Sequence, residues 1–277
     1  MKFMSYNLNL SLGPLKNFVL LGYCDFIKDL EIECKKLKIN FYFITTKDQI
    51  KNCESIPKNT LVTNIFNKNK VKNFLIDVDF SDSNSFALSI GARWIFSKQI
   101  IDKLFFNKIF NCHGARLPID RGGGGFSWRI MRGDRIGIVL MHLMNEGIDT
   151  GPIIFHDDYV IPKDKITPKE ISVDYRIRLK DFLLNFINSV SKQTKKFDLF
   201  KQTNISSTYL PRLSTNKNGY INWSWNPLDI QNFILAFEEP YEGAKTYLNN
   251  ELVFIKKTQL HVGEIGNHPY QSRIISR

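Results

Sequence analysis

Apolar and polar residues alternate in blocks along the first part of the chain. Residues 16–22 form a continuous apolar run that ends in glycine, which is typical of a buried parallel strand. Asp25 follows as the expected N-cap of a helix, and one face of this helix is apolar. Residues 40–45 return to a strand pattern. The chain therefore begins with a βαβ unit, whose crossover we expect to be right-handed.

The alternation of strands and helices continues as far as residue 193. Further strands are predicted near residues 74–78, 86–90, 108–112, 136–144 and 153–161. Helices are predicted at residues 65–74, 126–132 and 167–193. Strands that alternate with helices in this way favour an open, mostly parallel α/β sheet.

A polar stretch at residues 194–206 is typical of a linker, so residues 1–193 form one predicted domain and residues 207–277 another. The predicted elements of the second domain are a helix at 227–237 and short strands at 244–248 and 252–256. We therefore expect a smaller, mainly β C-terminal domain. The final residues, 268–277, have the pattern of a strand that begins and then stops early, which leaves open whether the C-terminus is truncated.

The composition is that of a globular protein. Hydrophobic residues make up 43% of the chain, with only 16 Gly and 10 Pro, which excludes a disordered or low-complexity chain. No apolar run approaches the roughly 20 residues that cross a bilayer, so we expect a cytoplasmic protein without a membrane partner. The four cysteines lack a C-x-x-C spacing, and we expect them to be reduced: Cys24, Cys34, Cys53 and Cys112.

The formal net charge is +11. Such a charge fits either a nucleic-acid partner or a small anionic substrate such as a nucleotide, and the charge alone does not choose between them. The lysines are scattered along the chain instead of forming one basic block, which favours a solvated surface.

Three polar residues stand at the ends of segments that should be buried strands. Asn111 and His113 flank Cys112 at a strand exit, and because side chains alternate across a strand, Asn111 and His113 point the same way. Asp149 lies in a glycine-hinged loop after the strand at 136–144. A carboxamide, an imidazole and a carboxylate at one strand-end surface form a plausible set for acid/base work and oxyanion stabilisation. Each residue taken alone is equally explained as structure, and a histidine inside the strand, His142, is expected to be a satisfied core residue.

Two loops are candidates for ligand contact. Residues 91–94 break the pattern at a strand end, where ligands of open α/β sheets usually lie, although a simple strand-to-helix turn explains them equally well. Residues 122–125 are four consecutive glycines, which allow close backbone approach to a ligand. This second loop lacks the Gly-Lys-Ser/Thr of a phosphate-binding P-loop.

The strand-end residues belong to a longer ordered pattern. The pattern consists of Asn111-x-His113, Leu117-Pro118, Arg121-Gly122, Trp128, Gly133 and Ile148-Asp149-Thr150-Gly151. In this order it resembles the formyltransferases that use N10-formyltetrahydrofolate. A weaker resemblance continues through Leu210-Pro211-Arg212, Gly219-x-Ile221-x-Trp223 and Pro240-Tyr241-x-Gly243-Ala244, so the resemblance covers nearly the whole chain.

The resemblance implies a Rossmann-like catalytic domain with helices on both faces of the sheet. It also implies direct formyl transfer to an amine, with N10-formyltetrahydrofolate as co-substrate and no metal. Asn111, His113 and Asp149 match the family's catalytic trio. An attacking amine would create a tetrahedral oxyanion, which the Asn111 amide and a protonated or donating His113 stabilise, while Asp149 orients His113 and helps remove the proton. No covalent intermediate is required, so Cys112 is not the expected nucleophile.

The resemblance also implies two sets of binding residues. The residues expected to hold the folate are Gly91, Ala92, Arg93, Trp94 and Ile148. Arginine binds phosphate oxygens and aromatic rings stack on bases. The expected contacts to the second substrate are therefore Arg121, Gly122, Trp223, Trp225 and Tyr241, and Arg93 is also a candidate for contact with a diphosphate. A structural role explains the arginines and aromatic residues equally well.

Two departures from the translation enzyme of the family favour a particular acceptor. Gly123-Gly124-Gly125 replaces the small residues and proline that follow Arg-Gly in methionyl-tRNA formyltransferase, and the C-terminal domain is short. Both features resemble the sugar N-formyltransferases, so we expect a nucleotide-linked amino-deoxysugar, dTDP-linked by preference, in O-antigen or lipopolysaccharide biosynthesis. A homodimer is expected. The alternatives are a methionyl-tRNA formyltransferase, which the net charge supports, and a non-catalytic folate-binding module.

Overall fold

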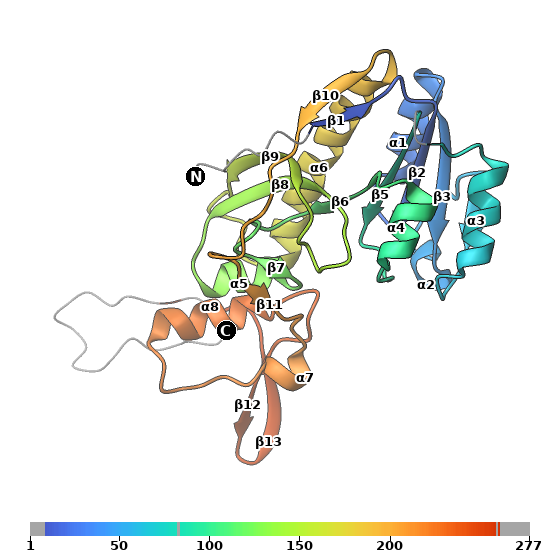
Figure 1. The fold of residues 1–277 in the computed structure, drawn as a ribbon. Coiled ribbons are helices and arrows are strands. Elements are labelled where there is room, and N and C mark those ends of the chain that lie inside the picture. Colours follow the sequence, from blue (N-terminus) through green and yellow to red (C-terminus); the bar gives the residue numbers. More distant parts are fainter. Residues whose placement is uncertain (1–8, 82–83, 259, 261–277) are drawn as a thin grey trace. The chain divides into compact units, whose positions relative to one another are not determined.

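The computed structural model describes residues 9–81, 84–258 and 260, and Figure 1 shows its fold. The chain divides into two compact units. Unit 1 comprises Met1–Arg121, Val139–Asp157 and Arg178–Ser207, and unit 2 comprises Gly122–Ile138, Asp158–Ile177 and Thr208–Arg277. The boundaries expected from the sequence, at residues 193 and 207, stay a prediction, and the tail at 268–277 lies outside the described residues.

Unit 1 is built on a seven-stranded sheet. In sheet order its strands are β4 (Thr60–Val62), β3 (Asn40–Thr45), β2 (Asn17–Gly22), β5 (Ser85–Ile90), β6 (Ile109–His113), β8 (Ile136–Leu143) and β9 (Ile153–Val160). The strands from β4 to β6 are parallel, and β8 runs antiparallel to β6. Counted along the chain, the order is 3-2-1-4-5-6 followed by one further strand, which is the Rossmann arrangement. The predicted Rossmann-like, mostly parallel α/β fold is confirmed.

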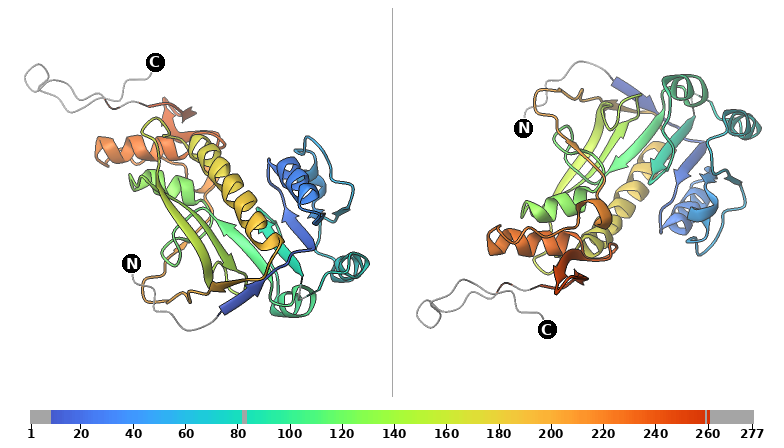
Figure 2. Two further views of the ribbon diagram at one scale, coloured as in Figure 1. Left: turned by 90° about the horizontal axis from the view of Figure 1, so that it is seen from above. Right: turned by 90° about the horizontal axis from the view of Figure 1, so that it is seen from below.

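Helices cover both faces of this sheet, as Figure 2 shows. On one face lie α3 (Lys68–Asp77) and α4 (Lys98–Phe105), which share an apolar core with Val19 and Leu21 of β2. Residues of opposite parity on the same strands point the other way, because side chains alternate across a strand.

The second face is covered by α1 (Ile27–Lys36) and α6 (Pro168–Ser191). The ring of Phe186 on α6 lies 5.5 Å from that of Phe86 on β5. Asn188 of α6 donates to the carboxylate of Glu33 on α1 at 2.8 Å, so the two helices are neighbours.

Some local expectations in unit 1 are wrong. Phe26, not Asp25, is the N-cap residue of α1, and no side chain caps this helix. The strand expected at residues 74–78 is the last part of α3, which begins three residues later than expected because the side chain of Asn67 caps it by accepting from the backbone of Lys70. The helix α4 has no counterpart among the predicted elements.

The polar segment expected to be a linker contains a strand. β10 (Lys195–Asp198) pairs antiparallel with β1 (Asn9–Leu12) in a separate two-stranded sheet. The lysines of β10 make it look like solvent-exposed chain, but its Phe197 packs against Phe186 with ring centres 5.4 Å apart.

Unit 2 holds the smaller C-terminal part of the chain. Its elements are α5 (Gly125–Met131), β11 (Tyr209–Leu210), α7 (Thr215–Asn218), α8 (Pro227–Ala236) and the hairpin of β12 (Ala244–Leu248) and β13 (Glu251–Ile255). α8 begins after Asn226, whose side chain accepts from the backbone of Asp229 at 2.9 Å, and it packs its Phe233 and Ile234 into an apolar core. The described residues thus combine a buried helix with the expected strands.

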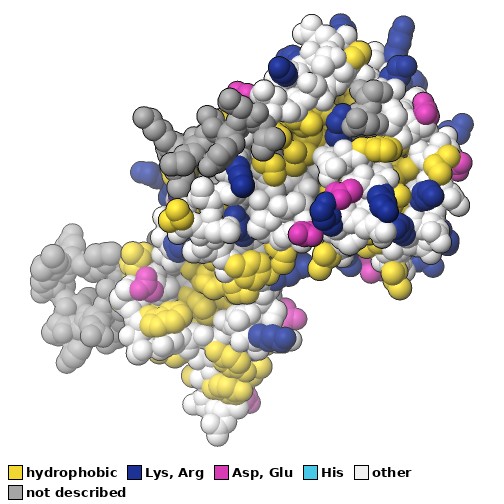
Figure 3. All heavy atoms as spheres, in the orientation of Figure 1, with side chains coloured by type: hydrophobic (Ala, Val, Ile, Leu, Met, Phe, Trp, Pro, Cys, Tyr) yellow, Lys and Arg dark blue, Asp and Glu magenta, His cyan; other side chains and the backbone are white. Residues whose placement is uncertain are grey.

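The visible surface differs between the two units (Figure 3). Lys and Arg side chains are scattered over unit 1 in this view, and apolar side chains are exposed over unit 2, including its hairpin. The exposed apolar residues of the hairpin are Tyr247, Leu248, Leu252 and Phe254. Within the described part of the chain, every helix is too short or too polar to span a bilayer.

Candidate active site

The structure brings Asn111, His113 and Asp149 together in unit 1. Asn111 and His113 project from the end of β6, on the side of the strand opposite to Cys112, and Asp149 lies in the loop between β8 and β9. One carboxylate oxygen of Asp149 lies 3.8 Å from Nδ1 of His113. Both side chains are largely buried, so their mutual attraction is weakly screened.

His142 lies between Asn111 and Asp149 and contacts both. It stands opposite Asn111 in the β6–β8 ladder, and Nδ2 of Asn111 lies 3.2 Å from Nε2 of His142. Nδ1 of His142 lies 2.8 Å from the Leu143 carbonyl, which can only accept, so Nδ1 carries the proton and Nε2 accepts from Asn111. The same Nε2 lies 3.6 Å from Asp149. The sequence indicated a core histidine, and His142 is indeed buried, but it also orients the Asn111 amide.

The surroundings of His113 favour its neutral form. Its Nε2 lies 3.0 Å from the backbone carbonyl of Asp120 and therefore donates to it, which leaves the Nδ1 lone pair on the side of Asp149. Burial lowers the pKa of His113 below its usual 6.5, and the Asp149 carboxylate opposes this by raising the pKa. A neutral imidazole with an available lone pair can accept a proton from an attacking amine.

Asp149 adopts an unusual backbone conformation. Its φ is 51°, in the left-handed region that residues other than glycine rarely adopt. The Nε2 amide group of Gln202 donates to the carbonyl of Asp149 at 2.8 Å and to that of Gly151 at 2.7 Å. Gly151 is required because a Cβ there would lie 1.8 Å from the Leu143 carbonyl oxygen. The loop is thus held closely against the end of β8.

Arg121 forms hydrogen bonds with the same Gln202 side chain. Its Nε and Nη2 donate to Oε1 of Gln202 at 3.1 and 3.0 Å, and its Nη1 donates to Asn204 at 3.0 Å. The side chain is buried. This geometry favours a structural role, and a substrate contact by Arg121 stays a prediction. Gln202 has no local sequence signal, since it lies in the polar stretch expected to be a linker.

The loop after β5, where the folate is expected, is also closely packed. Gly91 follows β5 with a φ of 57°, and its carbonyl accepts from Nε2 of Gln49, on α2 (Lys47–Ile50), at 2.8 Å. A Cβ on Gly22 would lie 2.2 Å from the Ile90 carbonyl and 2.6 Å from the Ala92 nitrogen. The ends of β2 and β5 therefore meet here, which is where the strand order reverses and where ligands of this fold usually lie.

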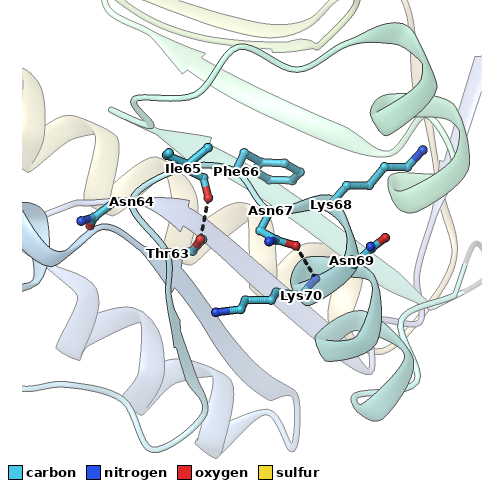
Figure 4. Close-up of a pocket in the computed structure, with 8 residues that line it drawn as sticks. All are labelled: Thr63, Asn64, Ile65, Phe66, Asn67, Lys68, Asn69 and Lys70. Atoms are coloured by element: carbon cyan, nitrogen blue, oxygen red, sulfur yellow. Dashed lines mark hydrogen bonds between the residues drawn. The ribbon is translucent and has the colours of Figure 1, made fainter.

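The other expected folate contacts differ in their surroundings. Ala92 and Trp94 pack against the core beneath α3 and α4, Arg93 forms an exposed ion pair with Asp48 at 3.5 Å, and Ile148 is exposed before Asp149. Beside Trp94 lies a pocket of about 520 Å³ (Figure 4), lined by Thr63, Asn64, Ile65, Phe66, Asn67, Lys68, Asn69 and Lys70. Trp94 borders it through a hydrogen bond to the Asn64 carbonyl and a ring contact with Phe66.

The aromatic residues expected to bind the second substrate lie in unit 2. Trp223 is half exposed and donates to Thr246 at 2.8 Å, whereas Tyr241 packs against Phe237, the C-cap residue of α8. Trp225 is exposed and forms one wall of a pocket of about 430 Å³, whose other lining residues are Trp128, Met131, Leu213, Asn218, Asp229 and Phe233. Roles of these residues in substrate binding stay predictions.

Gly122, the other expected substrate contact, has a backbone reason to be glycine. It ends β7 (Arg121–Gly122) with a φ of 97°, and a Cβ there would lie 2.4 Å from the Leu210 carbonyl of β11. Its contact with substrate stays a prediction. Among residues 9–81, 84–258 and 260, no three His, Cys, Asp or Glu side chains are grouped to hold a metal ion.

Two family profiles match the sequence in succession. That of the formyl transferase domain matches residues 16–181, and that of the formyl transferase C-terminal domain matches residues 214–276. The chain belongs to the formyl transferase family. The first match contains Asn111, His113, His142 and Asp149, while Gln202 lies between the two matches.

The sequence is also similar to those of individual methionyl-tRNA formyltransferases. The methionyl-tRNA formyltransferase of Thermodesulfovibrio yellowstonii is 27% identical over 178 residues, which are 64% of this chain and 56% of that protein. The matched segment thus spans little more than half of that relative's length.

Solved structures of similar fold include sugar-modifying enzymes. WlaRD, a sugar 3N-formyl transferase crystallised with dTDP and 5-N-formyl-THF, is 21% identical with a TM-score of 0.63, over 92% of this chain and 89% of that chain. An N-formyltransferase from Helicobacter canadensis, in complex with folinic acid and dTDP-3-aminofucose, is also 21% identical with a TM-score of 0.63, over 91% and 90% of the two chains. At these identities the likeness is one of fold.

Proposed function

We propose that this formyl transferase moves a formyl group from N10-formyltetrahydrofolate to the amine of a nucleotide-linked amino-deoxysugar. The observation that carries the proposal is the arrangement around Asp149, whose carboxylate lies 3.8 Å from Nδ1 of His113 and 3.6 Å from Nε2 of His142. The Asn111 amide is hydrogen-bonded to His142. The group therefore contains a proton acceptor (His113), a carboxylate (Asp149) and an amide donor (Asn111). Formyl transfer to an amine requires such a set.

The proposed reaction uses these groups in sequence. The amine lone pair attacks the formyl carbon, the carbonyl electrons move to oxygen, and the second N–H of the Asn111 amide donates to the oxyanion. Nδ1 of neutral His113 accepts the proton that the amine loses, and Asp149 stabilises the imidazolium. When the oxyanion collapses, the bond from the formyl carbon to N10 breaks and His113 returns the proton to N10. The products are the N-formylated sugar and tetrahydrofolate.

Two findings support a nucleotide sugar as the acceptor, with dTDP as the favoured nucleotide. WlaRD and the Helicobacter canadensis enzyme were crystallised with dTDP or a dTDP-linked amino sugar, and their folds match about nine tenths of this chain. The proposal includes the further expectations of a cytoplasmic homodimer that serves O-antigen or lipopolysaccharide biosynthesis.

A methionyl-tRNA formyltransferase is the second candidate. It is supported by the 27% identity to the Thermodesulfovibrio yellowstonii enzyme and by the net charge of +11, since cationic proteins bind RNA phosphates. This candidate requires steeply salt-dependent tRNA binding as well as formylation of the charged tRNA.

The test is a product assay with N10-formyltetrahydrofolate and three acceptors: a dTDP-3-amino sugar, a dTDP-4-amino sugar and methionyl-tRNA. Tetrahydrofolate release is followed by absorbance and the formylated product by mass spectrometry. We expect equimolar tetrahydrofolate and N-formyl sugar with one dTDP-linked acceptor. Formylation of methionyl-tRNA alone would establish the second candidate, and no turnover with any nucleotide-linked amino sugar would overturn the proposal.

A further inference from the structure

We infer that Gln202 is a positioning residue for the reaction, which rests on the proposed function above. Its side-chain amide holds the Asp149 loop in its left-handed conformation, and Arg121 fixes the direction in which that amide points. Neither residue contacts the reacting atoms in the proposed reaction. They act through the backbone of Asp149.

The segment that carries Gln202 is anchored beside this loop. Phe200 and Ile153 exchange two backbone hydrogen bonds, of 2.9 and 2.8 Å, at the start of β9. Gln202 follows two residues later and reaches the carbonyls of Asp149 and Gly151 at 2.8 and 2.7 Å. The loop is therefore held on one side by β8 and on the other by this segment.

The direction of the Gln202 amide is determined by its partners. Oε1 accepts two hydrogen bonds from the guanidinium of Arg121, so Nε2 must face the two carbonyls. A flipped amide would turn its oxygen toward two carbonyl oxygens and its NH₂ group toward the cation. Only a side chain with an acceptor and a two-proton donor at this length satisfies both partners, and glutamine is that side chain.

Burial makes the contact hard to replace. Gln202 and Arg121 are each 8% exposed, so solvent does not readily substitute for a lost donor. The carbonyl that Gln202 holds belongs to the residue whose φ is 51°, and this conformation persists only where its surroundings enforce it. Without the two bonds the Asp149 backbone relaxes, and the carboxylate leaves its position between His113 and His142.

Two substitutions at Gln202 test its hydrogen bonds from Arg121 and those to the Asp149 and Gly151 carbonyls. Gln202→Glu keeps the acceptor for Arg121 but replaces the donor with a charged oxygen that repels the two carbonyls, whereas Gln202→Met removes both the acceptor and the donor without adding charge. We expect each to lower kcat by about 10- to 100-fold, the scale of a misplaced reacting group, with KM for both substrates within about twofold of the original.

A matched control is Gln231→Glu. The Gln231 amide also donates to a backbone carbonyl, that of Thr258 at 3.4 Å, and it belongs to unit 2. We expect this variant to keep the original kcat. Thermal unfolding of all variants checks that the Gln202 variants are folded at the assay temperature.

A second measurement needs no turnover. The Asp149 carboxylate raises the pKa of His113, so its displacement in Gln202→Met should lower that pKa in an NMR titration, in the same direction as Asp149→Asn. Unchanged kcat in Gln202→Glu together with an unchanged His113 pKa in Gln202→Met would overturn the inference. A shifted pKa in a protein that formylates no amine would instead overturn the proposed function and leave the positional role standing. If Gln202→Met does not fold, kcat of Gln202→Glu decides, because the added carboxylate would itself raise the pKa of His113.

Discussion

Two strand-end loops of unit 1 are each held by one buried glutamine, and they are held differently. After β5, Gln49 makes a single hydrogen bond to Gly91, a glycine that adopts its positive φ without strain. After β8, Gln202 makes two bonds, and the residue with positive φ is Asp149. In the proposed reaction the first loop needs only a shape that accepts the folate, whereas the second must hold a carboxylate in one orientation.

The largest expected effect comes from removing that carboxylate. Asp149→Asn should lower kcat by about 100- to 10,000-fold, the range for loss of acid–base assistance, because the His113 imidazolium is then no longer stabilised. Steady-state kinetics with the dTDP-linked acceptor measure the effect. Asp157→Asn, which changes an exposed carboxylate on β9, is the control and should leave kcat unaltered. Equal rates for the two variants would refute the role of Asp149.

The next test replaces the glutamine that holds each loop by methionine, one loop at a time. Gln202→Met should lower kcat by about 10- to 100-fold and leave folate affinity unchanged. Gln49→Met should do the reverse, weakening the affinity for a folate analogue about 3- to 10-fold, since one hydrogen bond contributes about 1 kcal/mol. Calorimetry gives the affinities. If both variants changed the same parameter, the two loops would not have separate roles.

The pH dependence of activity distinguishes the same two loops. The pKa of His113 is lowered by burial, so the basic form that accepts the proton persists below pH 6.5, and kcat should decline only under more acidic conditions. Asp149→Asn removes a charge that raises this pKa, and its acid limb should move to still lower pH. Gln49→Met should leave the limb in place. An acid limb above pH 6.5 in the unaltered enzyme would contradict a neutral His113.

The free energy of unfolding should also depend on pH through the titration of His113. Because the pKa of His113 is lower in the folded state than the 6.5 of an unfolded chain, the unfolded state binds more protons below that pH. The His113 contribution to stability is therefore complete above pH 6.5 and falls as the pH drops toward the folded-state pKa. Replacing His113 by Asn should remove this part of the pH dependence in urea unfolding curves.

The smallest expected effect is at the surface of the folate loop. Asp48 forms an exposed ion pair with Arg93, and such pairs contribute at most about 1 kcal/mol. Asp48→Asn should therefore change folate affinity by less than about threefold, measured by the same calorimetry. A larger loss would mean that Arg93 needs Asp48 to contact the folate.

Much of the fold was accessible from the sequence because burial leaves a periodic signature. The continuous apolar run of β2 and the helical spacing of α6 predict their elements within two residues of the observed ends. The period-two spacing of Asn111 and His113 likewise predicts that they share one side of β6. β10 was not predicted because its lysines give it the composition of exposed chain, and its only packed apolar side chain is Phe197.

The supporting contacts of the site were not accessible, because they depend on which strands pair and in what register. His142 is an ordinary apolar-strand histidine until the β6–β8 ladder sets it opposite Asn111. Gln202 lies 53 residues from Asp149 in the sequence, within a stretch of linker composition. Arg121 belongs to a recognisable motif, but only the structure shows that its guanidinium donates to Gln202 and Asn204.

The proposed reaction depends on His113 as the proton acceptor, and replacing His113 by Asn tests that dependence. The measurement compares kcat for formylation of a dTDP-linked amino sugar in the original protein and in His113→Asn, with folate affinity measured in parallel. We expect a loss of about 100- to 10,000-fold in kcat with folate affinity retained. Undiminished formyl transfer by His113→Asn would refute the role of His113 as the proton acceptor.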